Sequence, residues 1–264
     1  MLLPSPLHRS AVGFSLLELL VSVTVLSILV MILAQVITLT GQAIGINTKK
    51  LDGAGQARIF FNRLAADLAA RPQRADLGMT WTKAAGNDAI RFYSAVGGYS
   101  GARNVSLIGY RIQEAAPGRL FQLERGATGA DWLAGGSHPL FLTQALASPN
   151  AEDYEVLSQG VLRLEFSYLL NTASPATRVS LAAASDYSDV GAVIVAIAVL
   201  DAKSRLLLSP AQLGALSRAL SDSVAGEEPI ATWSAQILRA DFAPGVPKQA
   251  IQGLHLYQHL FNVP

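Results

Sequence analysis

Cysteine is absent from this 264-residue chain, and charged side chains make up only 15% of it. The lack of cysteine excludes disulfide bonds, thiol catalysis and cysteine-ligated metals. Twenty basic and 19 acidic residues leave a net charge of +1, and the basic residues are scattered along the chain. We therefore expect no nucleic-acid partner. The chain is long enough for one sizeable domain besides an anchor.

Formal charge is almost missing from residues 14–40, where Glu18 is the only charged side chain. The run is longer than the roughly 20 apolar residues that a helix needs to cross the hydrocarbon core of a bilayer. We therefore predict a transmembrane helix here. A lone acid inside such a segment costs about 2.5–3.5 kcal/mol on insertion scales, so Glu18 requires a partner or a function.

A short polar and basic segment, residues 1–13, precedes the apolar run and ends at a glycine. A secretory signal places its apolar segment before the cleavage site, whereas here the candidate cut comes first. The apolar helix would then stay with the mature protein. The residues around the candidate cut read Gly13-Phe14-Ser15-Leu16-Leu17-Glu18.

This arrangement resembles the class III signal of type IV pilins and type II secretion pseudopilins, whose pattern G-F-[ST]-L-[LIV]-E is matched at every position by residues 13–18. The resemblance implies that Gly13 is the last leader residue and that a prepilin peptidase cleaves after it. It implies that Phe14 becomes an N-methylated amino terminus and that Glu18 pairs with the terminal ammonium of a neighbouring subunit. A buried carboxylate is tolerable when a cation is supplied, so this pairing would act as a register check on assembly. An ordinary signal anchor with an incidental glutamate is the alternative.

Proline is missing between Pro6 and Pro72, and a helical pattern continues beyond the apolar run. We predict one long helix over residues 14–71, with its transmembrane part at residues 14–40. The helix should end at Pro72, because proline disfavours helical geometry in the residue before it.

Two features of this helix carry further predictions. Glycines from Gly41 to Gly55 are expected to bend or fray it, since each costs about 1 kcal/mol relative to alanine. In the part beyond them, Arg63 and Asp67 are spaced as an i,i+4 ion pair on the side opposite to an apolar face. That predicted face consists of Ala57, Phe61, Leu64 and Leu68.

The chain beyond Pro72 is predicted to form strands. Residues 162–168 alternate apolar and polar side chains and give the clearest half-buried strand. Residues 191–200 are continuously apolar, which is typical of a buried central strand. The other predicted strands are residues 89–93 and a hairpin formed by residues 108–112, a turn at 116–118 and residues 119–125.

The order of these elements resembles the J-type minor pseudopilin of type II secretion. In that family a long helix is followed by a hairpin, by the pattern G-V-x-x-L-x-F-x-Y and by an apolar strand. The corresponding pieces here are Tyr110-Arg111, Arg119-Leu120, Gly160-Val161 with Leu164, Phe166 and Tyr168, and residues 193–200. The resemblance implies an α+β fold in which the long helix, membrane-spanning in its first half, packs on a mainly antiparallel, pilin-like β domain over residues 72–201.

Residues 202–264 depart from the J-type pattern and are predicted as an extension made of a helix and strands. Ser209 and Pro210 form a good helix start, and that helix is predicted up to about Val224. Strands are predicted over residues 233–242 and 253–261. A long carboxy-terminal extension on such a body also resembles the verrucomicrobial cassette proteins that carry prepilin leaders.

Candidate sites for chemistry are weak. His255 and His259 would lie on one side of the last strand, where a solvated polar face is a better interpretation than a metal site. Asp186 and Asp189 could suggest calcium, but too few oxygen donors surround them, and a turn is favoured. We expect no cofactor, metal or small-molecule substrate, and no motif indicates an enzyme.

These features predict a non-enzymatic minor pilin or pseudopilin subunit of a type IV pilus or a type II secretion pseudopilus. The expected partners are a prepilin peptidase, other pilin subunits bound through the N-terminal helix, and the lipid bilayer. We expect a single-pass inner-membrane protein with a periplasmic C-terminal domain. This orientation follows from the resemblance, because basic residues flank the apolar run on both sides and the positive-inside rule favours neither direction. The alternatives are an anchored binding domain that does not assemble, and an anchored hydrolase.

Overall fold

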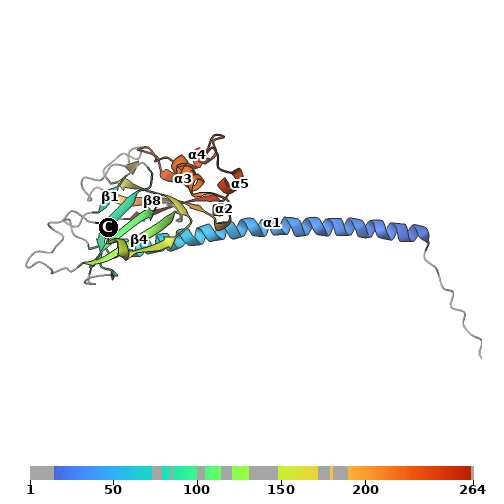
Figure 1. Ribbon diagram of the computed structural model, residues 1–264, viewed down its shortest axis with the longest axis horizontal. Helices are drawn as coiled ribbons and strands as arrows, with labels where there is room; N and C mark the ends of the chain where they lie inside the picture. Colours follow the sequence, from blue (N-terminus) through green and yellow to red (C-terminus); the bar gives the residue numbers. More distant parts are fainter. Residues whose placement is uncertain are drawn as a thin grey trace, which may run out of the picture. The chain divides into compact units, whose positions relative to one another are not determined.

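A computed structural model of the chain describes residues 15–72, 79–83, 86–99, 105–113, 121–130, 148–171, 179–180 and 190–262. The side chains of residues 39–51 and 179–180 lie outside that description. The chain divides into two compact units, residues 1–48 and 49–264. The long helix α1 contributes to both units, and all of the strands and short helices belong to the second (Figure 1). The protein is therefore an α+β chain with a long N-terminal helix.

Helix α1 runs from Leu16 to Ala69, close to the predicted range of 14–71. It ends just before Pro72, as the proline requires. The backbone is helical throughout residues 41–55, so the predicted fraying is wrong. The cost of each glycine is only about 1 kcal/mol, and a helix that continues on both sides needs no new nucleation there.

The strands of the second unit form two antiparallel sheets. The five-stranded sheet has the order β1-β2-β3-β4-β5, and the four-stranded sheet has the order β7-β6-β8-β9. The strands of the first sheet are β1 (Thr80–Thr82), β2 (Ala89–Ser94), β3 (Val105–Gln113), β4 (Gln122–Ala130) and β5 (Tyr154–Ser158), with a single 3-10 turn, η2 (Ala151–Asp153), before β5. Those of the second are β6 (Val161–Leu170), β7 (Val179–Ser180), β8 (Val190–Leu200) and β9 (Leu254–Asn262).

The predicted hairpin is present as the antiparallel pair β3 and β4, in register from Val105 opposite Ala130 to Gln113 opposite Gln122. Its predicted turn at 116–118 lies outside the described residues. Strands β1 and β5 were not predicted. Both are short, at three and five residues, so they carry little periodic signal.

Strand β8 lies between β6 and β9, which confirms the prediction of a buried central strand. Strand β9 confirms the strand predicted over residues 253–261, although burial does not alternate along it. It pairs with β8 over nine residues, from Leu254 opposite Leu200 to Asn262 opposite Ala192. The C-terminal segment is thus built into the same sheet as β6 and β8.

Strand β6 was predicted to be half-buried, and this is wrong. Every residue from Val161 to Tyr168 is buried, including Arg163, Glu165 and Ser167 on the polar side. The reason is that the C-terminal segment covers that side, as the Ser217 hydroxyl donates to the Leu162 carbonyl (2.8 Å). Alternation in sequence reports polarity, and here the polar side faces protein instead of water.

Four short helices follow β8: α2 (Ala202–Arg205), α3 (Pro210–Ala219), α4 (Pro229–Ile237) and α5 (Lys248–Ile251). Helix α3 confirms the start predicted at Ser209, whose side chain and that of Gln212 form a capping box. It ends at Ala219, short of the predicted Val224.

The strand predicted over residues 233–242 is wrong, because Trp233 lies within helix α4. Pro229 occupies the first turn of this helix, where its fixed backbone angle favours helical geometry. Ile230, Trp233 and Ile237 are spaced as on one face of a helix. The predicted strand began at Trp233 and left out Ile230, so this spacing was missed. The Trp233 ring is fully buried.

One hydrophobic core joins the C-terminal part of α1 to both sheets and to the short helices. The buried face of α1 consists of Gly53, Ala57, Phe60, Leu64 and Asp67 among the described side chains. The predicted face was therefore displaced, since Phe61 is only partly buried and Asp67 points into the protein. The i,i+4 spacing to Arg63 favoured a solvent-facing ion pair, but a stronger partner lies across the core.

Candidate functional site

The first part of α1 is the candidate assembly segment. Among the described residues one helix, over Leu16–Thr38, is long and apolar enough to cross a membrane, and its side chains are exposed. At 1.5 Å per residue its 23 residues span about 35 Å, compared with about 30 Å for the hydrocarbon core. An exposed apolar surface of this kind requires lipid or other protein around it.

Most hydroxyl groups in this segment are satisfied within the helix. Ser22, Thr24, Ser27 and Thr38 each donate to a backbone carbonyl three or four residues earlier, at 2.6–2.8 Å. Such bonds remove the cost of placing a hydroxyl in an apolar medium. Glu18 differs from them, since its carboxylate makes no hydrogen bond or ion pair with any residue that the structure describes. It is the only ionisable side chain in the span Leu16–Thr38.

Glu18 lies in the first turn of α1, where its N–H donates to the Ser15 hydroxyl (3.3 Å). Gly13 and Phe14, the residues of the predicted cleavage, lie outside the described residues. The helix thus begins within two residues of the predicted new amino terminus.

A buried ionic network anchors the C-terminal part of α1 to the five-stranded sheet. Asp67 of α1 is contacted twice by Arg125 of β4, through Nε at 2.6 Å and Nη2 at 3.0 Å. The Tyr110 hydroxyl of β3 donates to the same carboxylate at 2.6 Å, and the Ser94 hydroxyl of β2 donates to the Asp67 carbonyl. Three neighbouring strands therefore hold one helical residue.

Electrostatics in this network favour a charged pair. Burial of Tyr110 and the neighbouring Asp67 carboxylate raise the pKa of the phenol well above its ordinary value. Burial alone would lower the pKa of Arg125, but its hydrogen bonds to Asp67 and the charge of that carboxylate raise it overall. Both groups therefore keep their protons at any physiological pH, and the network is a permanent attachment.

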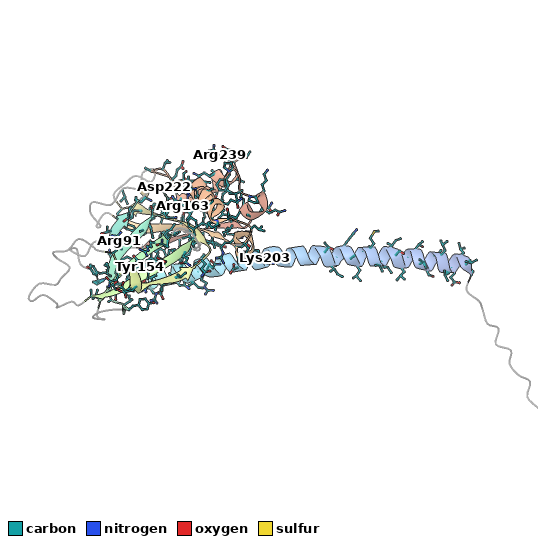
Figure 2. The ribbon with its side chains drawn as sticks, viewed as in Figure 1. Arg91, Tyr154, Arg163, Lys203, Asp222 and Arg239 are labelled. Carbon is teal, nitrogen blue, oxygen red and sulfur yellow. The ribbon has the colours of Figure 1, made fainter. Side chains whose placement is uncertain are left out.

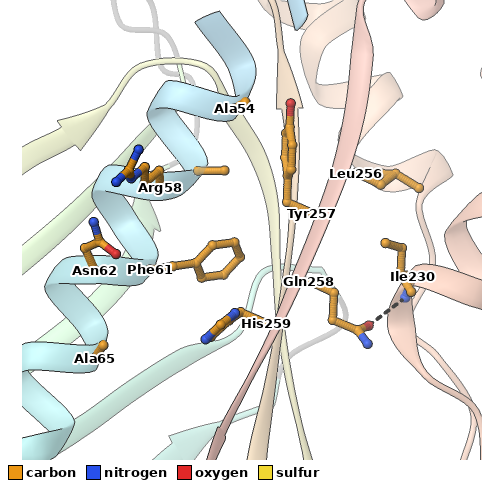
Figure 3. Close-up of a pocket in the computed structure, with 11 residues that line it drawn as sticks. Ala54, Arg58, Phe61, Asn62, Ala65, Ile230, Leu256, Tyr257, Gln258 and His259 are labelled. Atoms are coloured by element: carbon orange, nitrogen blue, oxygen red, sulfur yellow. Dashed lines mark hydrogen bonds between the residues drawn. The ribbon is translucent and has the colours of Figure 1, made fainter. Parts of the chain in front are cut away.

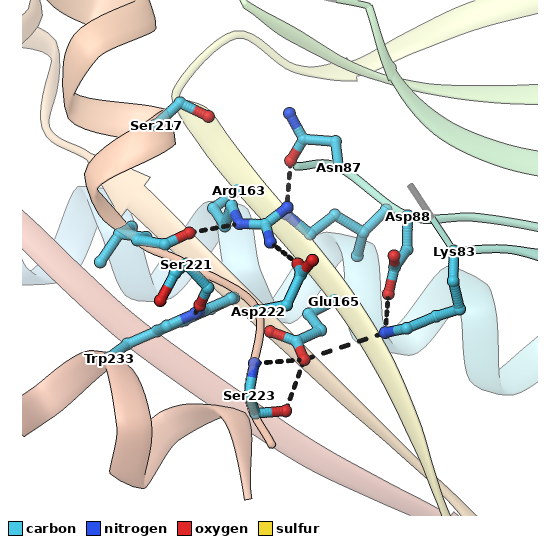
Figure 4. Close-up of polar contacts among 12 residues, drawn as sticks. Lys83, Asn87, Asp88, Arg163, Glu165, Ser217, Ser221, Asp222, Ser223 and Trp233 are labelled. Carbon is cyan, nitrogen blue, oxygen red and sulfur yellow. Dashed lines mark hydrogen bonds and ion pairs between the residues drawn. The ribbon is translucent and has the colours of Figure 1, made fainter. Parts of the chain in front are cut away.

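A second buried cluster lies where β6 meets the C-terminal segment (Figure 4). Lys83 Nζ contacts Asp88 Oδ2 at 2.5 Å, donates to the Phe166 carbonyl at 2.8 Å and lies 3.8 Å from Glu165 Oε1. The backbone N–H of Phe166 donates to Asp88 (2.8 Å), and that of Leu164 donates to Asn87 (2.9 Å). One lysine thus serves two buried carboxylates.

Asp88 is the titratable group of this cluster. Burial raises its pKa to about 6, and Lys83 and the Phe166 N–H only partly oppose that effect. The nearby Glu165 carboxylate raises it further, and Asp88 Oδ1 has no hydrogen-bond partner among the described residues. Ionised Asp88 is therefore costly in the folded protein.

Glu165 and Arg163 hold the loop that follows helix α3. Glu165 Oε1 accepts from the Ser223 hydroxyl (2.5 Å) and backbone N–H (3.0 Å). Arg163 Nε donates to the Leu220 carbonyl (2.9 Å), and its Nη2 pairs with Asp222, which lies nearby in Figure 2. The Trp233 indole closes the same loop by donating to the Ser221 carbonyl (3.0 Å). These side chains fix residues 220–223 against β6.

The histidines of β9 were predicted to form a solvated polar face, and this is wrong for one of the two. His255 is half-buried, as is Tyr257 between the histidines, whereas His259 is exposed. The His259 ring lies 5.6 Å from the Phe61 ring of α1, measured between centroids. A four-residue separation along a strand is about 13 Å, which is too far for both histidines to bind one ion. No group of three potential metal ligands occurs among the described residues. Asp186 and Asp189 lie outside them.

The buried networks could not have been located from sequence alone. Asp67 lies 43 residues from Tyr110 and 58 from Arg125 in the sequence, and Glu165 lies 58 residues from Ser223. The one available signal was the presence of charged residues inside otherwise strand-like or helical apolar patterns.

Comparison of the chain with protein-family models, with curated proteins and with solved structures finds no match. Inference about function therefore rests on the chain's own residues.

Proposed function

We propose that this chain is a non-enzymatic minor pilin or pseudopilin, a subunit of a type IV pilus or a type II secretion pseudopilus. It would be cleaved between Gly13 and Phe14, N-methylated at Phe14, and assembled through the first part of α1. Before assembly it would be a single-pass inner-membrane protein with residues 49–264 on the periplasmic side.

One observation carries this proposal: Glu18 is the only ionisable side chain of an exposed, membrane-length helix, and it follows Gly13 by five residues. A carboxylate without a partner in this apolar region would raise the free energy of the protein and offer no compensating interaction. The free ammonium of a processed neighbour would neutralise it, so assembly would remove the penalty. The self-satisfied hydroxyls of the same segment support this, because they leave the carboxylate as the group that needs a partner.

The rest of the chain supports a packing role. Buried charged residues in this part of the chain join its segments, as Asp67 and Glu165 do. An anchored binding domain that never assembles is the second candidate, favoured by the groove beside β9 described below.

Mass spectrometry of the protein isolated from its native membrane tests processing. We expect a mature chain that begins with a methylated Phe14. An intact Met1, or a cut beyond residue 30, would contradict the proposal. The Gly13→Asp variant, which should stay uncleaved, separates the two candidates: a pilin loses function, whereas an anchored binding domain keeps it in full.

A further inference from the structure

Strand β9 is the longest edge strand among the described parts of both sheets. It pairs with β8 on one side only, over nine residues without a break in register. The other edges are three residues in β1, five in β5 and two in β7, and the β4–β5 pairing also contains an irregularity. Short or bulged edges resist pairing with another chain, so β9 is the exception.

The sequence of β9 carries none of the usual protection of an edge. Leu254–Asn262 contains no proline, lysine, aspartate or glutamate. Proteins that leave an edge strand open normally place such residues there to prevent strand addition. No backbone hydrogen bond from the free side of β9 to any described residue is present. Along residues 256–259, the outer backbone N–H and C=O groups of β9 thus bond to no residue in the described part of the chain.

A groove of about 570 Å³ runs along this free edge (Figure 3). It touches four consecutive residues of β9, Leu256 to His259. Side chains alternate between the two faces of a strand, so a cavity that reaches consecutive residues must lie at the strand's edge. The four residues give a length of roughly 13 Å, which fits one short extended segment.

The walls of the groove come from two helices. On one side α1 contributes small residues, Ala54, Ala57 and Ala65, together with Phe61. On the other side is Ile230 of α4, whose N–H donates to Gln258 Oε1 (3.2 Å). The walls of the groove are therefore mainly apolar.

Arg58 is the one formally charged side chain that lines this groove. It forms no ion pair with any residue in the described part of the chain. The carboxylates nearby are engaged elsewhere: Glu228 accepts from Gln258 Nε2 (2.7 Å), and Asp52 accepts from Gln56 Nε2 (3.2 Å). The free charge in the groove is therefore positive.

We propose that the free edge of β9 binds an extended segment of another polypeptide, added as a fifth strand and carrying an acidic residue opposite Arg58. Backbone hydrogen bonds to β9 would supply affinity, and the apolar walls and Arg58 would select the side chains. This site does not depend on cleavage of the leader, so it stands or falls separately from the proposed assembly.

The test titrates a capped eight-residue peptide, alternating valine and serine with one central glutamate, into the full-length protein in detergent. We expect it to bind at least tenfold more tightly than the same peptide with a central lysine. Hydrogen exchange followed by mass spectrometry should show slower exchange of residues 254–262 on binding. Arg58→Glu should reverse the order of the two peptides, and Ala54→Trp, which fills the groove, should weaken both at least tenfold.

The matched control is Lys203→Glu, since Lys203 is an exposed basic residue of α2 outside the groove (Figure 2). It should leave both affinities unchanged. Equal affinity for the two peptides, or binding without slower exchange in β9, would overturn the proposal. Self-association that slows exchange in β9 without any peptide would also overturn it, because the occupant would then be a second copy.

Discussion

Glu18 and Asp67 are two carboxylates on helix α1 that differ in burial and in hydrogen-bonding partners. Asp67 is fully buried and receives hydrogen bonds from Arg125 and Tyr110, so its charge is satisfied within the chain. Glu18 is exposed in an apolar span and has no partner among the described residues. A charged group in an apolar setting must be neutralised. The difference shows that the Asp67 carboxylate is satisfied within the chain, whereas that of Glu18 has no partner among the described residues.

Replacing Asp67 should break the buried network that joins α1 to the five-stranded sheet. Among the variants considered, we expect this one to have the largest effect on stability. In Asp67→Ala, the buried guanidinium of Arg125 keeps only Glu155, at 3.4 Å, and the Tyr110 hydroxyl loses its acceptor. Breaking a buried pair from one side costs about 3–5 kcal/mol of unfolding free energy. Denaturant unfolding of the full chain in detergent, followed by tryptophan fluorescence, would measure the loss.

Arg63→Ala is the matched control for that measurement. Arg63 approaches Asp67 at 3.9 Å, but its side chain is 44% exposed. Exposed ion pairs contribute about 0–1 kcal/mol, so this variant should unfold almost like the wild type. Equal losses in the two variants would mean that Asp67 is held by its local helical neighbour and not by the sheet.

Asp88 sharpens the comparison, because its charge is only partly satisfied and should make stability depend on pH. Its pKa is about 6 in the folded protein and 3.8 ordinarily. An acid with a raised folded pKa stabilises the fold while protonated, so its contribution is fully present below 3.8 and lost as pH rises through about 6. The difference corresponds to on the order of 3 kcal/mol.

Asp88→Asn stays neutral at every pH and isolates this contribution. The difference in unfolding free energy between the wild type and the variant should fall by on the order of 2–3 kcal/mol from about pH 4 to pH 7. The groups that face Asp88 are Lys83, Glu165 and the Phe166 N–H, and the variant retains all three. Parallel pH profiles of the two proteins would show that Asp88 is not the titrating group.

Periodicity in the sequence, together with the positions of proline and helix-capping residues, predicted helices α1 and α3 and the central strands, but not helices α2, α4 and α5. The absence of proline before Pro72 predicted α1, the apolar run over residues 191–200 predicted β8, and Ser209 with Pro210 predicted the start of α3. Each of these signals depends on residues that are close together in the sequence, so it can be recognised without knowledge of the fold. Strands β1 and β5 lack it because they are too short.

The contacts that hold these elements together are non-local and were not predicted. Asp67 was assigned to Arg63 because that residue is four positions away, whereas its true partner Arg125 is 58 positions away on β4. The polar side of β6 was assigned to solvent, although residues 217–223 cover it. Of the candidate site, sequence located Glu18 and its apolar helix, but the groove beside β9 depends on which strand ends the sheet.

The central claim is that Glu18 needs a cation from a neighbouring chain, and filament assembly by Glu18→Gln tests it most directly. Thr24→Val is the matched control, since the Thr24 hydroxyl is already bonded to the Val21 carbonyl (2.8 Å). With processing at Phe14 confirmed in both, we expect Glu18→Gln to enter sheared filaments at less than about a tenth of the wild-type level and Thr24→Val to enter normally, because only the carboxylate can pair with an ammonium. Normal incorporation of Glu18→Gln would contradict the account.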